Sequence, residues 1–185
     1  MLRRILPISV LLFSITACEG VSTPAPNSSS GQTWVCGREY VNQAWGYQRR
    51  GVVLDTAGNV WQYNIKSSPT TLVNPWQPKD VSKMSEEELK LRYNGAMTTG
   101  KKVPAEDVAR HISLIEEASN ATPTQPKSVG ADMGQTLLYC YTYNGASRTY
   151  SQVMLDNKGD WESTNPSSAA KTLSTWLNAV LGDVN

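Results

Sequence analysis

The chain has 185 residues, of which 39% are hydrophobic, and it carries 17 Lys and Arg against 16 Asp and Glu. This length fits one ordinary globular domain and excludes a multidomain enzyme. The formal net charge of +1 excludes a nucleic-acid binder that relies on a surplus of basic residues on one face.

Residues 1–17 predict a secretory signal. A short basic start with Arg3 and Arg4 precedes an almost purely apolar run over residues 5–17. That run is too short to cross a bilayer, which takes about 20 apolar residues, but it suits the apolar region of a cleaved signal. We therefore expect this segment to direct export.

The stretch Ile15-Thr16-Ala17-Cys18 resembles the lipobox of bacterial lipoproteins, in which a branched residue and two small ones precede the lipidated cysteine. The resemblance implies cleavage before Cys18 and a lipid-bilayer anchor through its acyl chains. In enteric lipoproteins an aspartate after that cysteine resembles an inner-membrane retention signal, whereas this chain has Glu19. Glu19 therefore favours the outer membrane, with the protein facing the periplasm or the cell surface.

A flexible tether is predicted over residues 18–32. Its Ser-, Pro- and Gly-rich part has Val21 as its only large apolar side chain, so it cannot bury enough surface to order itself.

One folded domain is expected over residues 33–185, and its first part predicts three strands. Residues 34–40, 47–55 and 60–65 are rich in β-branched and aromatic side chains, and Gly58 supplies the left-handed position of a turn at 55–59.

The middle of the domain, residues 79–134, predicts a helical insert. Ser85 and Glu88 form a capping box that begins a helix at about residues 86–93, and Met84 with Leu89 forms the matching hydrophobic staple. Pro104 begins a second helix that ends near residue 120. A loop is expected to lead from there to residue 134.

The last part, residues 135–183, predicts strands and a helix. Alternation over residues 137–143 indicates a strand, and residues 156–159 indicate a hairpin turn. A helix is expected after Asn165 and Pro166, ending at Gly182. Its apolar stripe should pack on the sheet and consists of Ala169, Leu173, Trp176, Leu177 and Val180.

Two segments of the domain resemble each other, since residues 53–61 align with residues 154–161 with one deletion. This predicts an internal repeat, residues 33–78 and 135–183. Chance similarity within a chain rich in Trp and Tyr is the alternative. The expected fold class is α+β, with an antiparallel sheet from two related ββ(β)α units, the helical insert between them, and helices on one face.

Cys36 and Cys140 remain as a pair once Cys18 is lipidated. An even pair in an oxidising compartment predicts a disulfide, which requires a Cα–Cα distance below about 7 Å. Two free thiols or a metal pair are the alternatives, although no further Cys or His lies at ligand spacing from either residue.

The chain offers no recognisable catalytic set, and we expect no cofactor and no metal. His111, the only histidine, borders an apolar helical stripe, and no Gly-x-Ser-x-Gly elbow accompanies it. Residues 95–102 have the glycine and lysine spacing of a phosphate-binding loop, but Lys102 replaces the Ser or Thr and the segment follows a helix. We expect a turn between two helices there.

Acidic residues leave one enzymatic interpretation open. Asp156, Asp160 and Glu162 cluster in sequence without the spacing of a calcium loop. A carboxylate pair for glycoside hydrolysis, for example Glu39 with Asp55, is defined by distance rather than by spacing, and so the sequence neither supports nor excludes it.

Trp and Tyr side chains gather in the first part of the domain with arginines between them. One interpretation is structural, because a chain with a single Phe uses Trp and Tyr for its core. The other is a binding face, since these residue types stack on sugars and dominate protein interfaces. The candidate binding surface consists of Trp45, Tyr47, Arg49, Arg50 and Trp61.

These patterns favour a non-enzymatic envelope lipoprotein that binds a protein or glycan partner, including the inhibitor or immunity type, and no nucleic acid. A hydrolase acting on envelope polymer through a carboxylate pair is the first alternative. The second is a structural component of an envelope assembly, which would expose a large apolar patch.

Overall fold

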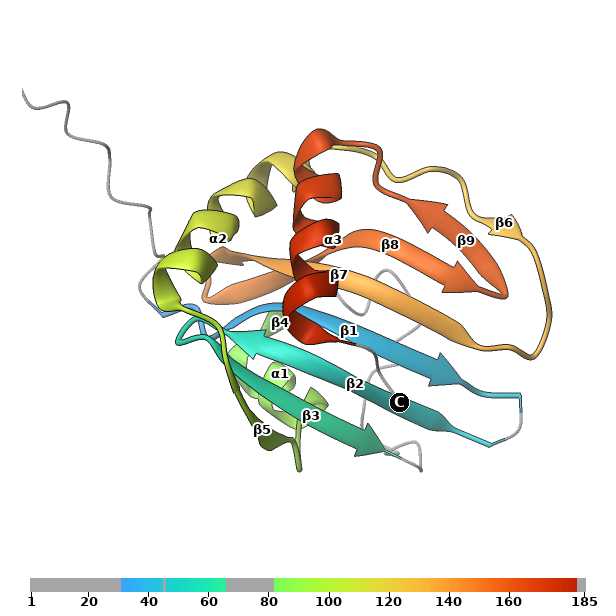
Figure 1. Ribbon diagram of the computed structural model, residues 1–185, viewed down its shortest axis with the longest axis horizontal. Coiled ribbons are helices and arrows are strands. Elements are labelled where there is room, and N and C mark those ends of the chain that lie inside the picture. The colour runs from blue at the N-terminus through green and yellow to red at the C-terminus, as the bar shows by residue number, and fades with distance from the viewer. Residues whose placement is uncertain (1–30, 45, 66–81, 183–185) are drawn as a thin grey trace, which may run out of the picture.

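Nine strands form one antiparallel sheet in the part of the chain that the structure describes, residues 31–44, 46–65 and 82–182 (Figure 1). This computed structural model confirms the predicted α+β fold class. The predicted signal sequence, Cys18, the predicted tether up to residue 30 and Trp45 lie outside the described residues.

The strand order is β5-β3-β2-β1-β7-β8-β9-β6, and β4 pairs with β8 off this path. No helix in the described part combines the length and apolar character that a membrane crossing requires. The elements are β1 (Trp34–Asn42), β2 (Gln48–Asp55), β3 (Asn59–Ile65), β4 (Ser82–Ser85), α1 (Glu86–Arg92), β5 (Met97–Lys102), α2 (Ala105–Ser119), β6 (Lys127–Ser128), β7 (Gln135–Asn144), β8 (Thr149–Gly159), β9 (Trp161–Thr164) and α3 (Ser168–Leu181).

The antiparallel pair of β1 and β7 lies in the middle of the sheet. Cys36 stands directly opposite Cys140, with a Cα–Cα distance of 3.8 Å, and the predicted disulfide is confirmed. From this pair outward, β2 and β3 follow on one side and β8 and β9 on the other. The two halves therefore have the same strand order, while their origin by duplication stays a prediction.

Of the two predicted hairpin turns, the structure confirms one and contradicts the other. The first is confirmed, because Asp55 Oδ1 accepts a hydrogen bond from the backbone N–H of Asn59 at 2.8 Å and Gly58 has a φ of +84°. The second is wrong, because residues 156–159 belong to β8, which pairs with β7 as far as Gly159. The chain turns one residue later, where the Asp160 carboxylate accepts from the backbone N–H groups of residues 133 and 134.

Local capping rules place all three helices to within a few residues. The capping box of Ser85 and Glu88 begins α1, and Pro104 precedes α2, as predicted. The N-cap of α3 is Ser167 rather than the expected Asn165. Asn165 instead holds the preceding turn, since its Nδ2 donates to the carbonyl of Ala118 at 2.9 Å and its Oδ1 accepts from Ser167.

The insert is more than helical, because β4 and β5 extend the sheet from within it. β5 replaces the turn that was expected at residues 95–102, and all of its side chains are exposed. It pairs with β3 as an edge strand, with an irregular register, a left-handed Gly100 and two terminal lysines. Irregular edges with charged residues discourage pairing with other chains.

Both faces of the sheet are covered, which corrects the expectation of helices on one face. Figure 1 shows α2 and α3 in front of the sheet and α1 behind it. The α2 and α3 side holds the aliphatic core, in which the α3 residues Leu173 and Leu177 are fully buried. The α1 side holds Leu89 among tyrosines.

Replacing Gly58 by alanine is expected to lower the free energy of unfolding by about 2–3 kcal/mol. A Cβ at this left-handed position would lie 2.0 Å from the carbonyl oxygen of Val103. Gly95→Ala is the matched control, because Gly95 has a φ of +78° with nothing within 4 Å of the added Cβ. Urea unfolding of both variants measures the difference, and equal losses would show that the backbone contact at Gly58 relaxes freely.

Candidate binding site

Side chains on the α3 face form rows across the sheet, because paired strands bring alternate residues into line. The row beneath the helices is apolar and buried, and consists of Val60, Leu54, Cys36, Cys140 and Val153. The next row contains Gln62, Val52, Arg38, Leu138 and Asp156. The row after that contains Asn64, Arg50, Tyr40, Thr136 and Lys158.

We call the last two rows together the polar platform. It begins where α3 ends, because Arg38 in its first row bonds to the carbonyl oxygen of Gly182. On β3, β1 and β8 the change from apolar to polar side chains occurs at this row, whereas on β2 and β7 it comes one row later, after Val52 and Leu138. Five strands spaced about 4.8 Å apart give the platform a width of about 19 Å. Gln62, Asn64 and Lys158 are exposed on it, whereas Val52 and Leu138 are buried between the longer polar side chains.

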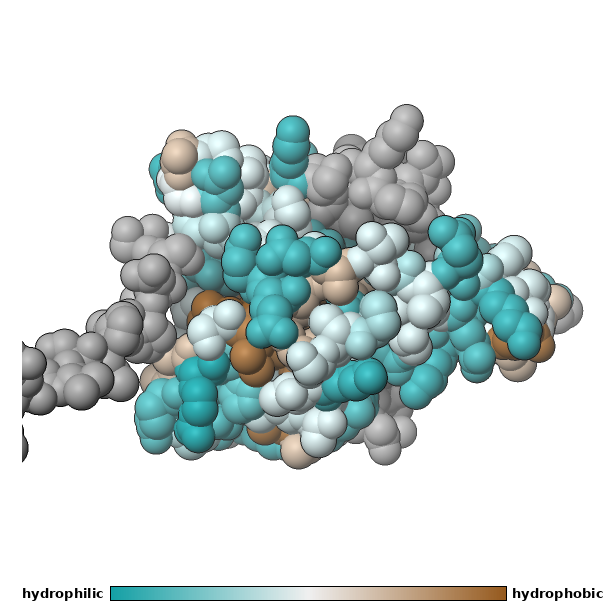
Figure 2. Space-filling view, turned by 90° about the horizontal axis from the view of Figure 1, so that it is seen from above, coloured by the Kyte–Doolittle hydropathy of each residue, from teal (hydrophilic) through white to brown (hydrophobic). Residues whose placement is uncertain are grey.

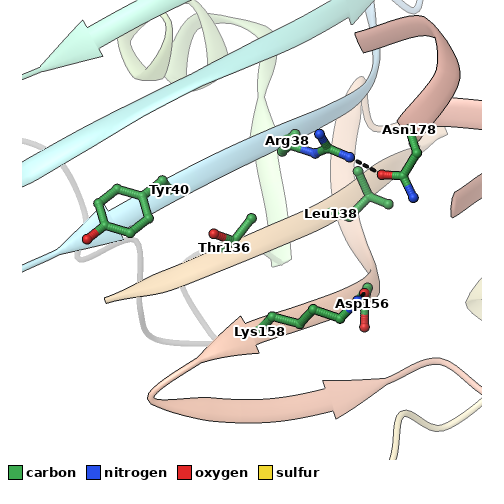
Figure 3. Close-up of a pocket in the computed structure, with 7 residues that line it drawn as sticks. All are labelled: Arg38, Tyr40, Thr136, Leu138, Asp156, Lys158 and Asn178. Atoms are coloured by element: carbon green, nitrogen blue, oxygen red, sulfur yellow. Dashed lines mark hydrogen bonds and ion pairs between the residues drawn. The ribbon is translucent and has the colours of Figure 1, made fainter. Parts of the chain in front are cut away.

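A pocket of about 250 Å³ opens on the part of the platform formed by β1, β7 and β8. Figure 3 shows its lining residues, six from β1, β7 and β8 and one from α3. They are Arg38, Tyr40, Thr136, Leu138, Asp156, Lys158 and Asn178. Its wall therefore mixes charged groups, an amide and a hydroxyl with an aromatic ring and an aliphatic side chain.

Arg38 fixes the end of α3 to the sheet. Its guanidinium group donates to the carbonyl oxygen of Gly182 and to Oδ1 of Asn178. A cation is favourable at this end of a helix, where the carbonyl groups carry partial negative charge. Because the bond to Arg38 engages the amide oxygen of Asn178, the amide nitrogen is turned the other way (Figure 3).

Tyr40 is a rigid aromatic surface beside the pocket. The Arg50 guanidinium lies over its ring, 4.2 Å from the ring centroid. Its hydroxyl donates to the carbonyl oxygen of Met133 at 2.9 Å and accepts from Nδ2 of Asn42 at 3.0 Å. The ring is thus held by contacts at its face and its tip before any ligand arrives.

Asp156 and Lys158 close the pocket on the β8 side. Their ion pair has an Nζ–Oδ2 distance of 3.0 Å, and the Lys158 side chain is 69% exposed. Oδ1 of Asp156 is shielded from solvent and has no hydrogen-bond partner. Among the described residues that line the pocket, Asp156 alone is acidic.

The opposite face carries a buried charge cluster, which consists of Glu39, Arg49 and Arg92. Arg49 Nε donates to one Glu39 carboxylate oxygen at 2.6 Å, and Arg92 Nη2 donates to the other at 3.0 Å. Burial opposes ionisation of Glu39, but the two guanidinium groups and a hydrogen bond from Tyr63 outweigh it, so the pKa of this carboxyl is lowered. With Glu39 only 2% exposed, the cluster is closed to ligands.

Tyrosines surround this cluster and account for much of the aromatic content. The Tyr93 hydroxyl lies 2.9 Å from that of Tyr139 and 2.6 Å from that of Tyr141. Burial raises the pKa of each of these phenols. Gly37 leaves the space that the Tyr139 ring fills, because a Cβ there would lie 2.6 Å from its hydroxyl.

Four of the five residues of the predicted binding surface lie in the described part of the chain, and these four do not form one surface. Arg49 is 1% exposed within the charge cluster, while its neighbour Arg50 points to the polar platform, because adjacent strand residues face opposite sides. Trp61 donates from Nε1 to Asp55 at 2.9 Å and packs on the tyrosine side. Tyr47 is partly buried ahead of β2, and Trp45 lies outside the described residues.

The carboxylate pair suggested for hydrolysis is not a pair. Glu39 stands opposite Gly51, and Asp55 lies four residues further along β2, which is about 13 Å of strand. Asp55 is engaged by Asn59 and Trp61 in the hairpin turn. The separation exceeds the 5–10 Å or so that glycosidases use, so this pair does not share a cleft.

His111 occupies a structural position. Its ring stacks on Trp176 at 4.0 Å, and Nδ1 lies 2.8 Å from the carbonyl oxygen of Asp107. The carboxylate of Asp107 accepts from Nε1 of the same Trp176. Within the described residues, no three His, Cys, Asp or Glu side chains gather closely enough to hold a metal ion.

Of the platform residues, Arg50 alone belongs to the binding surface that the sequence predicts. Arg38 and Tyr40 lie on the same strand face as buried Cys36. Polar or aromatic residues that follow a buried residue on one strand face indicate that the helices no longer cover the sheet there. Asp156 and Lys158 carried no comparable signal, because residues 156–159 resembled a turn.

Comparisons with known proteins identified no relative of this chain. No protein family model matches the chain, and neither the curated proteins nor the solved structures gave a significant match.

Proposed function

We propose that this chain is a non-enzymatic binding module of the bacterial cell envelope, anchored through an acylated Cys18, which engages a protein or glycan partner with its polar platform. The anchor rests on the lipobox resemblance. The binding role rests chiefly on the pocket, where Arg38, Tyr40 and Asp156 meet in an arrangement fixed by strand register and by the end of α3.

The platform suits binding because its polar groups need no rearrangement to meet a partner. Arg50 and Tyr40 are stacked, and Arg38 is bonded to α3, so little conformational freedom remains to be lost on association. Preorganised aromatic and arginine side chains also dominate the binding energy of known interfaces. Partners of the inhibitor or immunity type remain within this proposal.

The pocket gives less support to the two alternatives. Hydrolysis by a carboxylate pair requires two acidic groups in one cleft, and Asp156 is the single acidic residue among the described lining residues. A structural role in an assembly would need a large apolar surface. On the side seen in Figure 2, exposed apolar residues form small separate patches among hydrophilic ones.

Replacing Arg50 and Lys158 together by alanine is expected to reduce partner recovery at least about tenfold, because two platform contacts are lost. The bait is the full-length acylated protein, and the partner is captured from the detergent-solubilised envelope of the source cell. Lys90→Ala with Lys171→Ala is the matched control, since it removes two positive charges from exposed helix positions away from the platform. Equal recovery by both double variants, or no partner with the wild type, would overturn the proposal.

A further inference from the structure

We infer that the polar platform takes a glycan, recognised through its ring hydroxyl groups, with one sugar ring seated in the pocket between Asp156 and Asn178. This inference rests on the proposed binding function and names the ligand of that same site. Four features carry it: an acceptor without a donor, an amide donor among the residues that line the pocket, an apolar wall, and the length of the platform.

Asp156 provides the acceptor. Its Oδ2 is paired with Lys158, while its Oδ1 is shielded and accepts no hydrogen bond. A shielded carboxylate oxygen without a donor carries an uncompensated desolvation cost. Asp156 lines the pocket, and a hydroxyl of a bound ring can donate to its carboxylate there. A second carboxylate cannot, and so the site disfavours an acidic peptide side chain at this point.

Asn178 provides the donor. Its amide oxygen accepts from Arg38, which fixes the orientation of the group and leaves the NH₂ on the side away from Arg38 (Figure 3). Each sugar hydroxyl is both donor and acceptor. One hydroxyl can therefore donate to Asp156 while its neighbour accepts from Asn178, a pairing that a ligand with acceptors only or donors only does not satisfy.

The remaining wall of the pocket is apolar in the way that a sugar ring requires. Leu138 is 5% exposed at the floor, and the Tyr40 ring is held at the side by Arg50 and by its bond to the Met133 carbonyl. The C–H face of a pyranose packs on such surfaces while its hydroxyls reach the polar groups. At about 250 Å³, the pocket falls below the 300–1,000 Å³ or so of sites that enclose a whole drug-sized ligand, which fits a single ring.

The platform continues beyond the pocket with exposed amides. Asn64 stands beside Arg50, and Gln62 lies in the neighbouring row. Amide groups donate and accept hydrogen bonds and carry no charge. An oligosaccharide lying across β8, β7, β1, β2 and β3 would therefore meet hydroxyl-binding groups along the full width of about 19 Å.

The test measures binding of the full-length protein in detergent micelles by isothermal titration calorimetry. The probes are neutral hexasaccharides of glucose, galactose, mannose and N-acetylglucosamine, a hexamer of galacturonic acid, and a polyglutamate peptide of similar length. We expect at least one hexasaccharide to bind and the peptide not to bind. Asp156→Ala should weaken that binding at least about tenfold, whereas Glu116→Ala, which removes an exposed carboxylate from α2, should leave it unchanged.

The outcomes separate this inference from the proposed function. If no saccharide binds, or if Asp156→Ala and Glu116→Ala bind equally well, the glycan assignment is wrong. If polyglutamate binds instead, or if partner capture still depends on Arg50 and Lys158, the protein is a binding module with a protein ligand. If neither capture nor titration gives binding, both proposals fall. A preference for the galacturonic acid hexamer over every neutral probe would support the glycan assignment and identify the ligand as an acidic glycan.

Discussion

Replacing Glu39 by glutamine is expected to lower the free energy of unfolding by about 3–5 kcal/mol. Glutamine preserves the shape of the side chain but removes the one carboxylate that, among the described residues, pairs with Arg49 and Arg92. The two buried guanidinium groups would then lose this counter-charge. Urea unfolding followed by tryptophan fluorescence at neutral pH measures the loss.

Tyr63→Phe is the matched control for this variant. It removes the 2.7 Å hydrogen bond to Glu39 and leaves all three charges of the cluster in place. Its expected cost is about 1.5–3 kcal/mol, the range for a hydrogen bond to a charged group. If Glu39→Gln cost no more than Tyr63→Phe, ion pairing would not be what stabilises the cluster.

The same carboxyl predicts a dependence on pH. Its folded-state pKa lies below the ordinary value of 4.5, so the stability linked to its ionisation is present above that value and is lost as the pH falls through the lower folded pKa. The wild type should therefore lose stability in acid more steeply than Glu39→Gln. Unfolding midpoints measured from neutral pH down to about pH 3 should converge for the two proteins. A constant difference between the two midpoints would contradict the view that ionised Glu39 causes the loss of stability in acid.

Removing the disulfide is expected to cost about 4–5 kcal/mol, because it closes a long loop in the unfolded chain. The bonded cysteines are 104 residues apart in sequence. Cys36→Ala combined with Cys140→Ala avoids burying a new polar group at two fully buried positions. Thermal unfolding with and without a thiol reductant provides the internal control. Reductant should destabilise the wild type to the level of the double variant and leave that variant unchanged, whereas an insensitive wild type would refute the expectation.

Local rules explain which parts of this fold the sequence predicts. The capping box at Ser85, the turn at Gly58 and the apolar stripe of α3 each depend on residues within a few positions of one another. The extension of β8 depends instead on pairing with β7, and β4 and β5 form because distant strands offer their edges. The position of α1 behind the sheet depends on the tyrosines against which Leu89 packs on that face.

The binding site was predicted less well, for a related reason. Arg49 and Arg50 are adjacent in sequence, and alternation along a strand sends them to opposite faces, one into the charge cluster and one onto the platform. Bringing Asp156 next to Leu138 further requires the irregular register between residues 138 and 139. The position where α3 stops, which decides which row is uncovered, is a tertiary property that strand composition reveals only indirectly.

The central position of the β1 and β7 pair also bears on how the molecule assembles. The two strands at the middle of the sheet are separated by about half of the chain, so the contact that joins the halves forms between distant segments. Sheets whose central strands are far apart in sequence fold slowly, on a scale of about milliseconds to seconds. A chain delivered from its N-terminus would hold β1 with an open edge until β7 arrives, and during that interval it is most exposed to pairing with other chains. Aggregation during synthesis should therefore depend on how quickly β7 reaches β1.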